Sequence, residues 1–113
     1  MKTIDKTHKL FLEILLEKTR KEKYKWVMTG NSELKYQTEI TTGPAKKVVI
    51  FSKGCGCDTD SYFLELLDNN KLVYCVKWNS EDLISEDRIL LDGLYEIVAQ
   101  NDHLKDFLCV LLK

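Results

Sequence analysis

Apolar side chains recur at helical spacing in the first part of the chain. Phe11 and Leu15 lie four residues apart, as do Leu12 and Leu16, and Leu12 and Leu15 lie three apart. On a helix such positions fall on one face, so the pattern predicts an amphipathic helix over residues 3–22. Either Thr3 or Asp5 can supply the side-chain oxygen that caps its first turn.

The middle of the chain carries five runs with strand character, each ended by turn residues. Some runs are rich in aromatic and β-branched residues, and others alternate between apolar and polar positions, as strands do. The runs cover residues 24–29, 34–41, 46–52, 62–68 and 71–79. Gly43-Pro44 breaks the ladder after the second run, because proline lacks the backbone donor that a central strand needs. Consecutive strands joined by turns predict an antiparallel meander.

Asn69-Asn70 fixes the predicted register of the last hairpin. A two-residue type I′ turn needs positive φ at both positions, and asparagine tolerates that conformation. Asp68 then lies opposite Lys71, and side chains alternate between two faces. One face carries Tyr62, Leu64, Leu66, Val73 and Cys75, and the other carries Phe63, Leu67, Leu72, Tyr74, Val76 and Trp78. Both faces are apolar, so we expect helices on one face and a loop, a ligand or a second subunit on the other.

Helical spacing returns after the strands. A helix is expected to begin with a cap at Ser80 or Ser85 and to run to about Gln100. Asn101-Asp102 offers a stop and a new cap, after which a short last helix follows. Gly93 is expected to permit close packing against a strand. The predicted fold is a single α+β domain over 1–113: an antiparallel meander of about five strands with one N-terminal helix and two C-terminal helices.

Composition and charge narrow the class of protein. The 113 residues are 44% hydrophobic and 31% charged with a net charge of −1, as in ordinary globular domains. Positive charge gathers at the end of the first helix, where it suits the helix dipole. The cluster consists of Lys18, Arg20, Lys21 and Lys23. Glu17 and Glu22 interrupt it, so we favour a solvated helix end over a nucleic-acid contact.

The chain carries no sequence signal for a membrane or for export. It contains no run of about eighteen apolar residues that could span a bilayer. Its first residues also lack the apolar core of a secretion signal. We therefore expect a cytoplasmic protein with reduced thiols and no membrane partner.

Several of these segments together resemble, over nearly the whole chain, small bacterial and prophage α+β proteins. The segments are the helix over 11–17, the Lys25-Trp26 strand, the strand pair 62–68 and 71–76, the helix segment Leu94–Val98 and the leucine-rich tail. The resemblance implies an accessory or regulatory protein of bacterial mobile-element or phage origin. A component or inhibitor of a defence system would fit that class.

The loop between the third and fourth strands concentrates thiols and carboxylates between glycines. Its candidate site residues are Lys53, Cys55, Cys57, Asp58 and Asp60. A zinc site would need two more ligands, and neither Cys75 nor Cys109 has a cysteine or histidine at ligand spacing. We therefore predict no metal and no cofactor, and keep a metal- or thiol-dependent role for the Cys55/Cys57 loop as the alternative function.

Aromatic residues on neighbouring strands form the second candidate site. The residues are Trp26, Phe63, Tyr74 and Trp78, and aromatic side chains with polar handles suit interfaces. No nucleophile elbow, phosphate loop or dinucleotide fingerprint occurs in the sequence. We therefore predict a binding protein rather than an enzyme, with a protein partner or a homodimer on this surface and a small anionic ligand as a further candidate.

Overall fold

The computed structural model describes residues 2–21, 23–29, 35–40, 43–55 and 60–112. Its elements in chain order are α1 (Lys6–Arg20), β1 (Val27–Met28), β2 (Lys35–Glu39), β3 (Lys47–Cys55), β4 (Asp60–Asp68), β5 (Lys71–Asn79), the 3₁₀ turn η1 (Ser80–Asp82) and α2 (Ser85–Leu111). Asp5 is the N-cap of α1, and its carboxylate accepts a hydrogen bond from the backbone N–H of Thr7. This confirms one of the two predicted caps.

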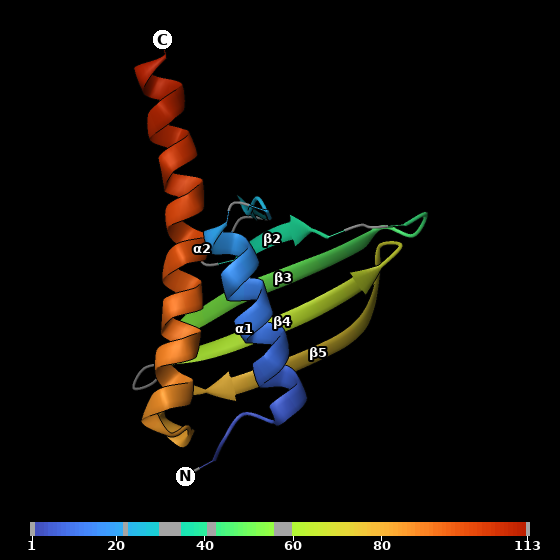
Figure 1. Ribbon diagram of the computed structural model, residues 1–113, viewed down its shortest axis with the longest axis vertical. Coiled ribbons are helices and arrows are strands. Elements are labelled where there is room, and N and C mark those ends of the chain that lie inside the picture. Colours follow the sequence, from blue (N-terminus) through green and yellow to red (C-terminus); the bar gives the residue numbers. More distant parts are fainter. Residues whose placement is uncertain (1, 22, 30–34, 41–42, 56–59, 113) are drawn as a thin grey trace.

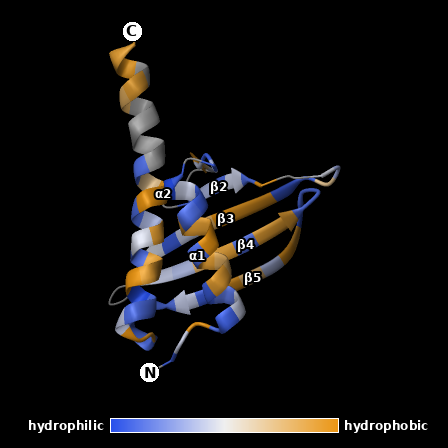
Figure 2. Ribbon diagram, in the orientation of Figure 1, coloured by the Kyte–Doolittle hydropathy of each residue, from blue (hydrophilic) through white to orange (hydrophobic). Residues whose placement is uncertain are grey.

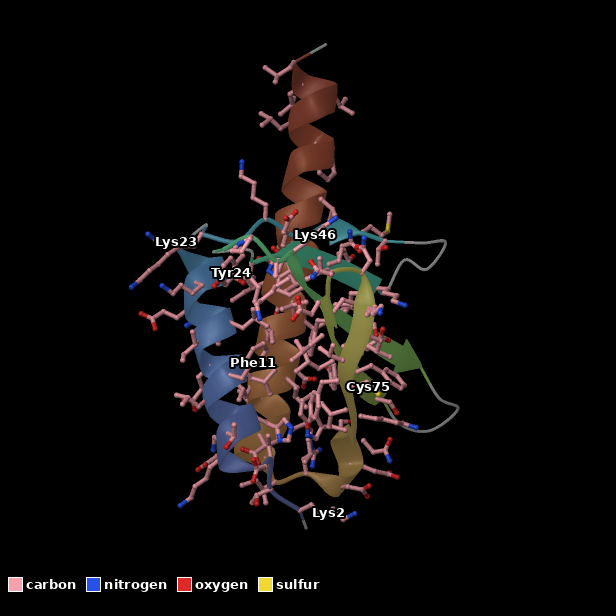
Figure 3. The ribbon with its side chains drawn as sticks, turned by 90° about the vertical axis from the view of Figure 1, so that its right-hand side faces the viewer. Lys2, Phe11, Lys23, Tyr24, Lys46 and Cys75 are labelled. Carbon is pink, nitrogen blue, oxygen red and sulfur yellow. The ribbon has the colours of Figure 1, made fainter. Side chains whose placement is uncertain are left out.

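The five strands form one antiparallel sheet in the order β1-β2-β3-β4-β5. The predicted α+β meander is therefore confirmed. Both helices lie on the same face of the sheet (Figure 1). Within the part of the chain that the structure describes, no element covers the opposite face. Figure 3 gives the side view, in which Phe11 lies between α1 and the sheet and Cys75 lies on the far side of β5.

The hairpin of β4 and β5 turns where the sequence predicts but pairs differently beyond the turn. Asn69 and Asn70 have φ of 52° and 68°, which confirms the type I′ conformation. Leu72 lies opposite Leu67 as expected, but a bulge follows, so that Tyr74 and not Val73 lies opposite Leu66. The predicted register is therefore wrong beyond Leu67.

The bulge changes which side chains share a face. One extra residue moves every later side chain of the strand to the other side of the sheet. Tyr74, Val76 and Trp78 consequently lie opposite Leu66, Leu64 and Tyr62, on the face that the helices cover. The uncovered face carries polar and apolar residues together. It includes Val48, Ile50, Phe63, Glu65, Leu67, Cys75 and Lys77.

The core lies between the covered face of the sheet and the two helices. Helix α1 contributes Leu12 and Leu15, and α2 contributes Leu91, Leu94 and Val98. The strands contribute Tyr36, Val49, Phe51, Tyr62, Leu64 and Trp78, and Trp26 joins them from the position before β1. Positions three or four apart on each helix point the same way, so one stripe of each helix is buried.

Two buried polar contacts fix the ends of α1. The indole Nε1 of Trp26 donates to Thr19 Oγ1 at 2.9 Å, and that hydroxyl donates to the carbonyl of Leu15 at 2.7 Å. At the other end, Asp87 Oδ2 accepts from the backbone N–H of Ile4 at 2.8 Å. Buried polar groups are costly without partners, so these bonds hold α1 in one position against β1 and α2.

Asp87 also forms an ion pair with α1. Lys9 Nζ lies 3.1 Å from Asp87 Oδ1, and the Asp87 carboxylate is fully buried. The hydrogen bond to Asp87 and its negative charge raise the pKa of Lys9 above its usual value. The segment before α1 is held further by backbone bonds from Lys2 to Asp82 and from Ile84 to Lys2. The start of α1 and the start of α2 are therefore joined as one unit.

Helix α2 differs from the prediction in three ways. It runs from Ser85 to Leu111 without a break, so the two predicted C-terminal helices are one. Asparagine and aspartate cost only about 0.7 kcal/mol each inside a helix, so Asn101-Asp102 does not stop it. The N-cap is Ile84 and not a serine. A Cβ on Gly93 would meet nothing within 4 Å, so this glycine does not permit close packing against a strand.

Candidate functional site

The structure does not bring the four predicted surface aromatics together. Trp26 and Trp78 are buried in the core, where Trp26 is held by Thr19. Phe63 lies on the uncovered face, where Lys77 Nζ is 5.6 Å from its ring centroid. Tyr74 lies on the covered face, at its edge. Tyr74 and Trp78 share one face, but Trp26 lies against Thr19 and Phe63 lies on the opposite face, so the four do not form one surface.

Tyr74 belongs to a small cluster at the start of α1. Its hydroxyl and His8 Nε2 share a hydrogen bond, and the two rings stack with centroids 5.6 Å apart. His8 also meets the edge of Trp78 at 5.9 Å, and its Nδ1 lies 3.5 Å from Asp5 Oδ2. Each polar atom of the imidazole therefore has a partner. The cluster joins α1 to the edge strand β5.

The predicted loop site is described only at its two ends. Cys55 ends β3 and Asp60 begins β4, and they lie opposite each other in the ladder. Cys57 and Asp58 lie outside the described residues. Among the residues that the structure does describe, no three histidine, cysteine, aspartate or glutamate side chains lie close enough to hold a metal ion. The metal- or thiol-dependent role stays a prediction.

Lys53, which the sequence assigns to the loop site, borders a second candidate site. Beside Lys53 lies a pocket of about 420 Å³ between the sheet and α2. Lys53 and Tyr62 line it from β3 and β4, where they lie opposite each other. Helix α2 lines it with Asp92, Tyr95, Glu96, Ala99 and Gln100. These positions are three or four apart, so a single face of α2 forms the wall.

The pocket combines aromatic and charged groups. Lys53 Nζ lies 5.8 Å from the ring centroid of Tyr62 and 5.4 Å from that of Tyr95, which is within range for cation–π attraction. The Tyr62 hydroxyl donates a hydrogen bond to Asp92 Oδ1. Tyr62 and Tyr95 meet edge to face at 6.2 Å, and Phe51 stacks on Tyr62 from the core. The two tyrosines are therefore fixed by packing, and the charged groups stand around them.

Sequence reasoning found Lys53 but missed the α2 side of this pocket. Asp92 and Glu96 look like ordinary solvated positions of an amphipathic helix, and Tyr95 looks like part of its apolar stripe. The signal that was available is the recurrence of Asp92, Tyr95, Glu96 and Ala99 at helical spacing. Nothing in the sequence indicates that this face of α2 meets the end of the β3–β4 hairpin.

The second unusual feature is the far part of α2, which projects beyond the sheet (Figure 1). Five large apolar side chains there are between 55% and 80% exposed. They are Phe107, Leu108, Val110, Leu111 and Leu112. Figure 2 shows the last turns as a strongly hydrophobic segment. Single exposed apolar residues are common on protein surfaces, but a contiguous group indicates an interaction site.

The uncovered face of the sheet is less suited to be an interface. Val48 and Ile50 are only 8% exposed there, although no described element covers them. Neighbouring side chains on the same face shield them, because Glu39 pairs with Val48 and Gln37 pairs with Ile50. Val48 and Ile50 therefore do not need a second subunit to leave water, although Leu72 and Cys75 remain exposed on the same face.

Comparison of the chain with protein families, with curated proteins and with solved structures finds no match. No relative therefore assigns a role to the pocket or to the projecting helix. Within the described part of the chain, no helix is both long enough and apolar enough to cross a bilayer. We therefore base the proposed function on the geometry and chemistry of the pocket and of the projecting helix.

Proposed function

We propose that the chain is a non-enzymatic binding protein whose projecting helix end inserts into an apolar groove of another protein. The helix end consists of residues 107–111 of α2 and the following Leu112. The observation that supports this proposal is the exposure of its five large apolar side chains. Burying one such side chain in a partner contributes roughly 1.5–3 kcal/mol, so the group could sustain a specific complex.

The distribution of these side chains favours a groove over a flat contact. At about 100° per residue, positions 107, 108, 110, 111 and 112 cover about 200° of the helix circumference. A seam between two helices needs a narrower stripe, whereas a helix that is apolar over most of its circumference is normally enclosed. Helix-in-groove recognition provides such an enclosure.

The same segment is poorly suited to a lipid bilayer. Helices that lie in the membrane surface usually carry lysine and arginine on their polar face. The preceding residues 100–106 contain two aspartates and only one lysine. A protein groove is therefore the occupant that we propose.

The wider role that we propose is regulatory, inside a bacterial cell, for a protein of mobile-element or phage origin. This part of the proposal rests on the resemblance to small prophage proteins. A binding protein that masks a surface of a host enzyme or of a defence system would use such a helix end. The sequence contains no nucleophile elbow, phosphate loop or dinucleotide fingerprint, which favours binding over catalysis.

Site-specific photo-crosslinking in the expressing cell tests the proposal. A photoreactive amino acid replaces Phe107 in one variant and Leu111 in another, and Lys18 on the surface of α1 serves as the control position. We expect one protein to crosslink from positions 107 and 111 but not from position 18. That protein, once purified, should bind the Leu111→Glu variant at least tenfold more weakly than the wild type.

Other outcomes would contradict the proposal. Crosslinks to lipid from positions 107 and 111 would identify a membrane contact. Crosslinks between two copies of the chain would identify self-association. Equal crosslinking from position 18 would show that the helix end has no special affinity.

A further inference from the structure

We infer that the pocket between β3, β4 and α2 binds a small zwitterion, such as a free α-amino acid with an apolar side chain. Its volume of about 420 Å³ falls within the range of ligand sites, which is roughly 300–1,000 Å³. The site is distinct from the helix end, and it differs from the small anionic ligand expected from the sequence.

The charged side chains that line the pocket support this inference. Among the described residues of the lining, Lys53 contributes one positive charge, and Asp92 and Glu96 contribute two negative charges. A purely anionic ligand would meet Lys53 but would also be repelled by two carboxylates. A ligand with a protonated amine and a carboxylate satisfies both signs at once.

The lining also offers suitable hydrogen-bond partners. The Tyr62 hydroxyl donates to Oδ1 of Asp92, and the second carboxylate oxygen of Asp92 can accept from an ammonium group. Glu96 lies four residues further along α2, on the same face, and is exposed. The ammonium group of Lys53 can donate to a ligand carboxylate as well as lie over the tyrosine rings. Charge-assisted hydrogen bonds of this kind are stronger than neutral ones.

The apolar part of the ligand has a defined place. The rings of Tyr62 and Tyr95 and the methyl group of Ala99 form the apolar part of the lining. Phe51 stacks on Tyr62, and Tyr95 also meets the ring of Tyr36 edge to face at 6.0 Å. Because both tyrosines are held in this way, a ligand would meet a surface that is already ordered.

Three small probes show whether binding requires the amine, the carboxylate or both. They are phenylalanine, which carries both charges, phenethylamine, which carries only the amine, and 3-phenylpropionate, which carries only the carboxylate. Binding is followed by ¹H–¹⁵N NMR titration of the full chain at pH 7. We expect phenylalanine to bind at least fivefold more tightly than either other probe, with the largest shifts at positions 53, 62, 95 and 96.

Two variants and two matched controls assign the contacts. Lys53→Met should weaken phenylalanine at least fivefold and leave phenethylamine nearly unchanged, whereas Glu96→Gln should weaken both amines. Lys77→Met removes the lysine that lies over Phe63 on the uncovered face, and Glu86→Gln changes another exposed glutamate of α2. Neither control should alter the dissociation constants, and thermal unfolding checks that each variant is folded.

Several results would overturn the inference. If 3-phenylpropionate bound most tightly, the preferred ligand would be an anion. If phenethylamine bound most tightly, it would be a simple amine. The pocket would not be a binding site if the shifts lay elsewhere, if no probe bound, or if the control variants had equal effects. None of these outcomes would affect the proposed role of the helix end, which is tested by crosslinking.

Discussion

The two parts of α2 both carry apolar residues at helical spacing but have opposite surroundings. In the first part, over residues 85–99, Leu91, Leu94 and Val98 are completely buried against α1 and the sheet. In the second part, over residues 100–111 and the following Leu112, the described apolar side chains face solvent. Both parts place leucine and valine at helical spacing. Helical periodicity therefore shows that a face is apolar, but not what covers it.

This difference has an energetic consequence. Apolar side chains in the first part contribute to the stability of the isolated chain, because folding removes them from water. The described apolar side chains of the second part remain in water after folding and can contribute only when something else covers them. The first part of α2 thus serves the fold, and the second part is available for binding.

The largest expected effect is the difference in stability loss between a leucine substitution in the first part of α2 and one in the second. Leu94→Ala leaves a cavity in the core and should lower the free energy of unfolding by about 2–5 kcal/mol. Leu111→Ala should change it by no more than about 0.5 kcal/mol, as for other surface substitutions. Urea unfolding followed by circular dichroism measures both values. Similar losses for the two variants would mean that the far part of α2 is packed in the isolated protein.

A smaller effect is expected where α2 is joined to the start of α1. Asp87→Ala leaves the buried N–H of Ile4 without its acceptor, which should cost about 1–3 kcal/mol. Glu86→Ala, at the adjacent exposed position, is the control and should cost less than about 1 kcal/mol. Equal losses in urea unfolding would show that the contacts of Asp87 do not stabilise the junction.

Gly93 offers a gain in stability within the packed part of α2. Since a Cβ at this position meets nothing within 4 Å, Gly93→Ala should add up to about 1 kcal/mol through helix propensity. A higher midpoint of thermal unfolding would confirm this. A loss of stability would show that the glycine serves the packing of α2, as the sequence led us to expect.

The smallest effect concerns the ion pair of Lys9 and Asp87. Because Asp87 raises the pKa of Lys9 above the ordinary value of 10.5, the pair stabilises the fold below that pH. Its contribution is lost as the pH rises through the raised pKa. The free energy of unfolding of the wild type should therefore approach that of Lys9→Met between pH 10 and 12. A constant difference across this range would contradict the assignment.

The sequence predicted the fold where local chemistry decides it. The Asn69-Asn70 turn, the cap at Asp5 and the order of the five strands all follow from short-range preferences. The bulge beside Leu66 could not be predicted, because the segment contains neither glycine nor proline to mark it. Its register depends on side-chain packing. Likewise, Asn101-Asp102 is a good cap in isolation but is tolerated inside a long helix.

The candidate site was harder to predict, because its parts come from distant segments. Lys53 and Tyr62 lie on one hairpin, whereas Asp92 and Glu96 lie thirty or more positions later on α2. Only tertiary packing brings them together. The aromatic surface predicted from Trp26 and Trp78 depended on the register of the hairpin, and the bulge places Trp78 in the core.

Amide hydrogen exchange of the isolated chain tests the division of α2 most directly. Residues 90–98 should exchange slowly, since their part of the helix is packed in the core, whereas residues 104–112 should exchange many times faster. Addition of the crosslinked partner should slow exchange over 104–112 and leave 90–98 unchanged. Equal protection of both parts in the isolated monomer would contradict the account, because the far part of α2 would then already be covered.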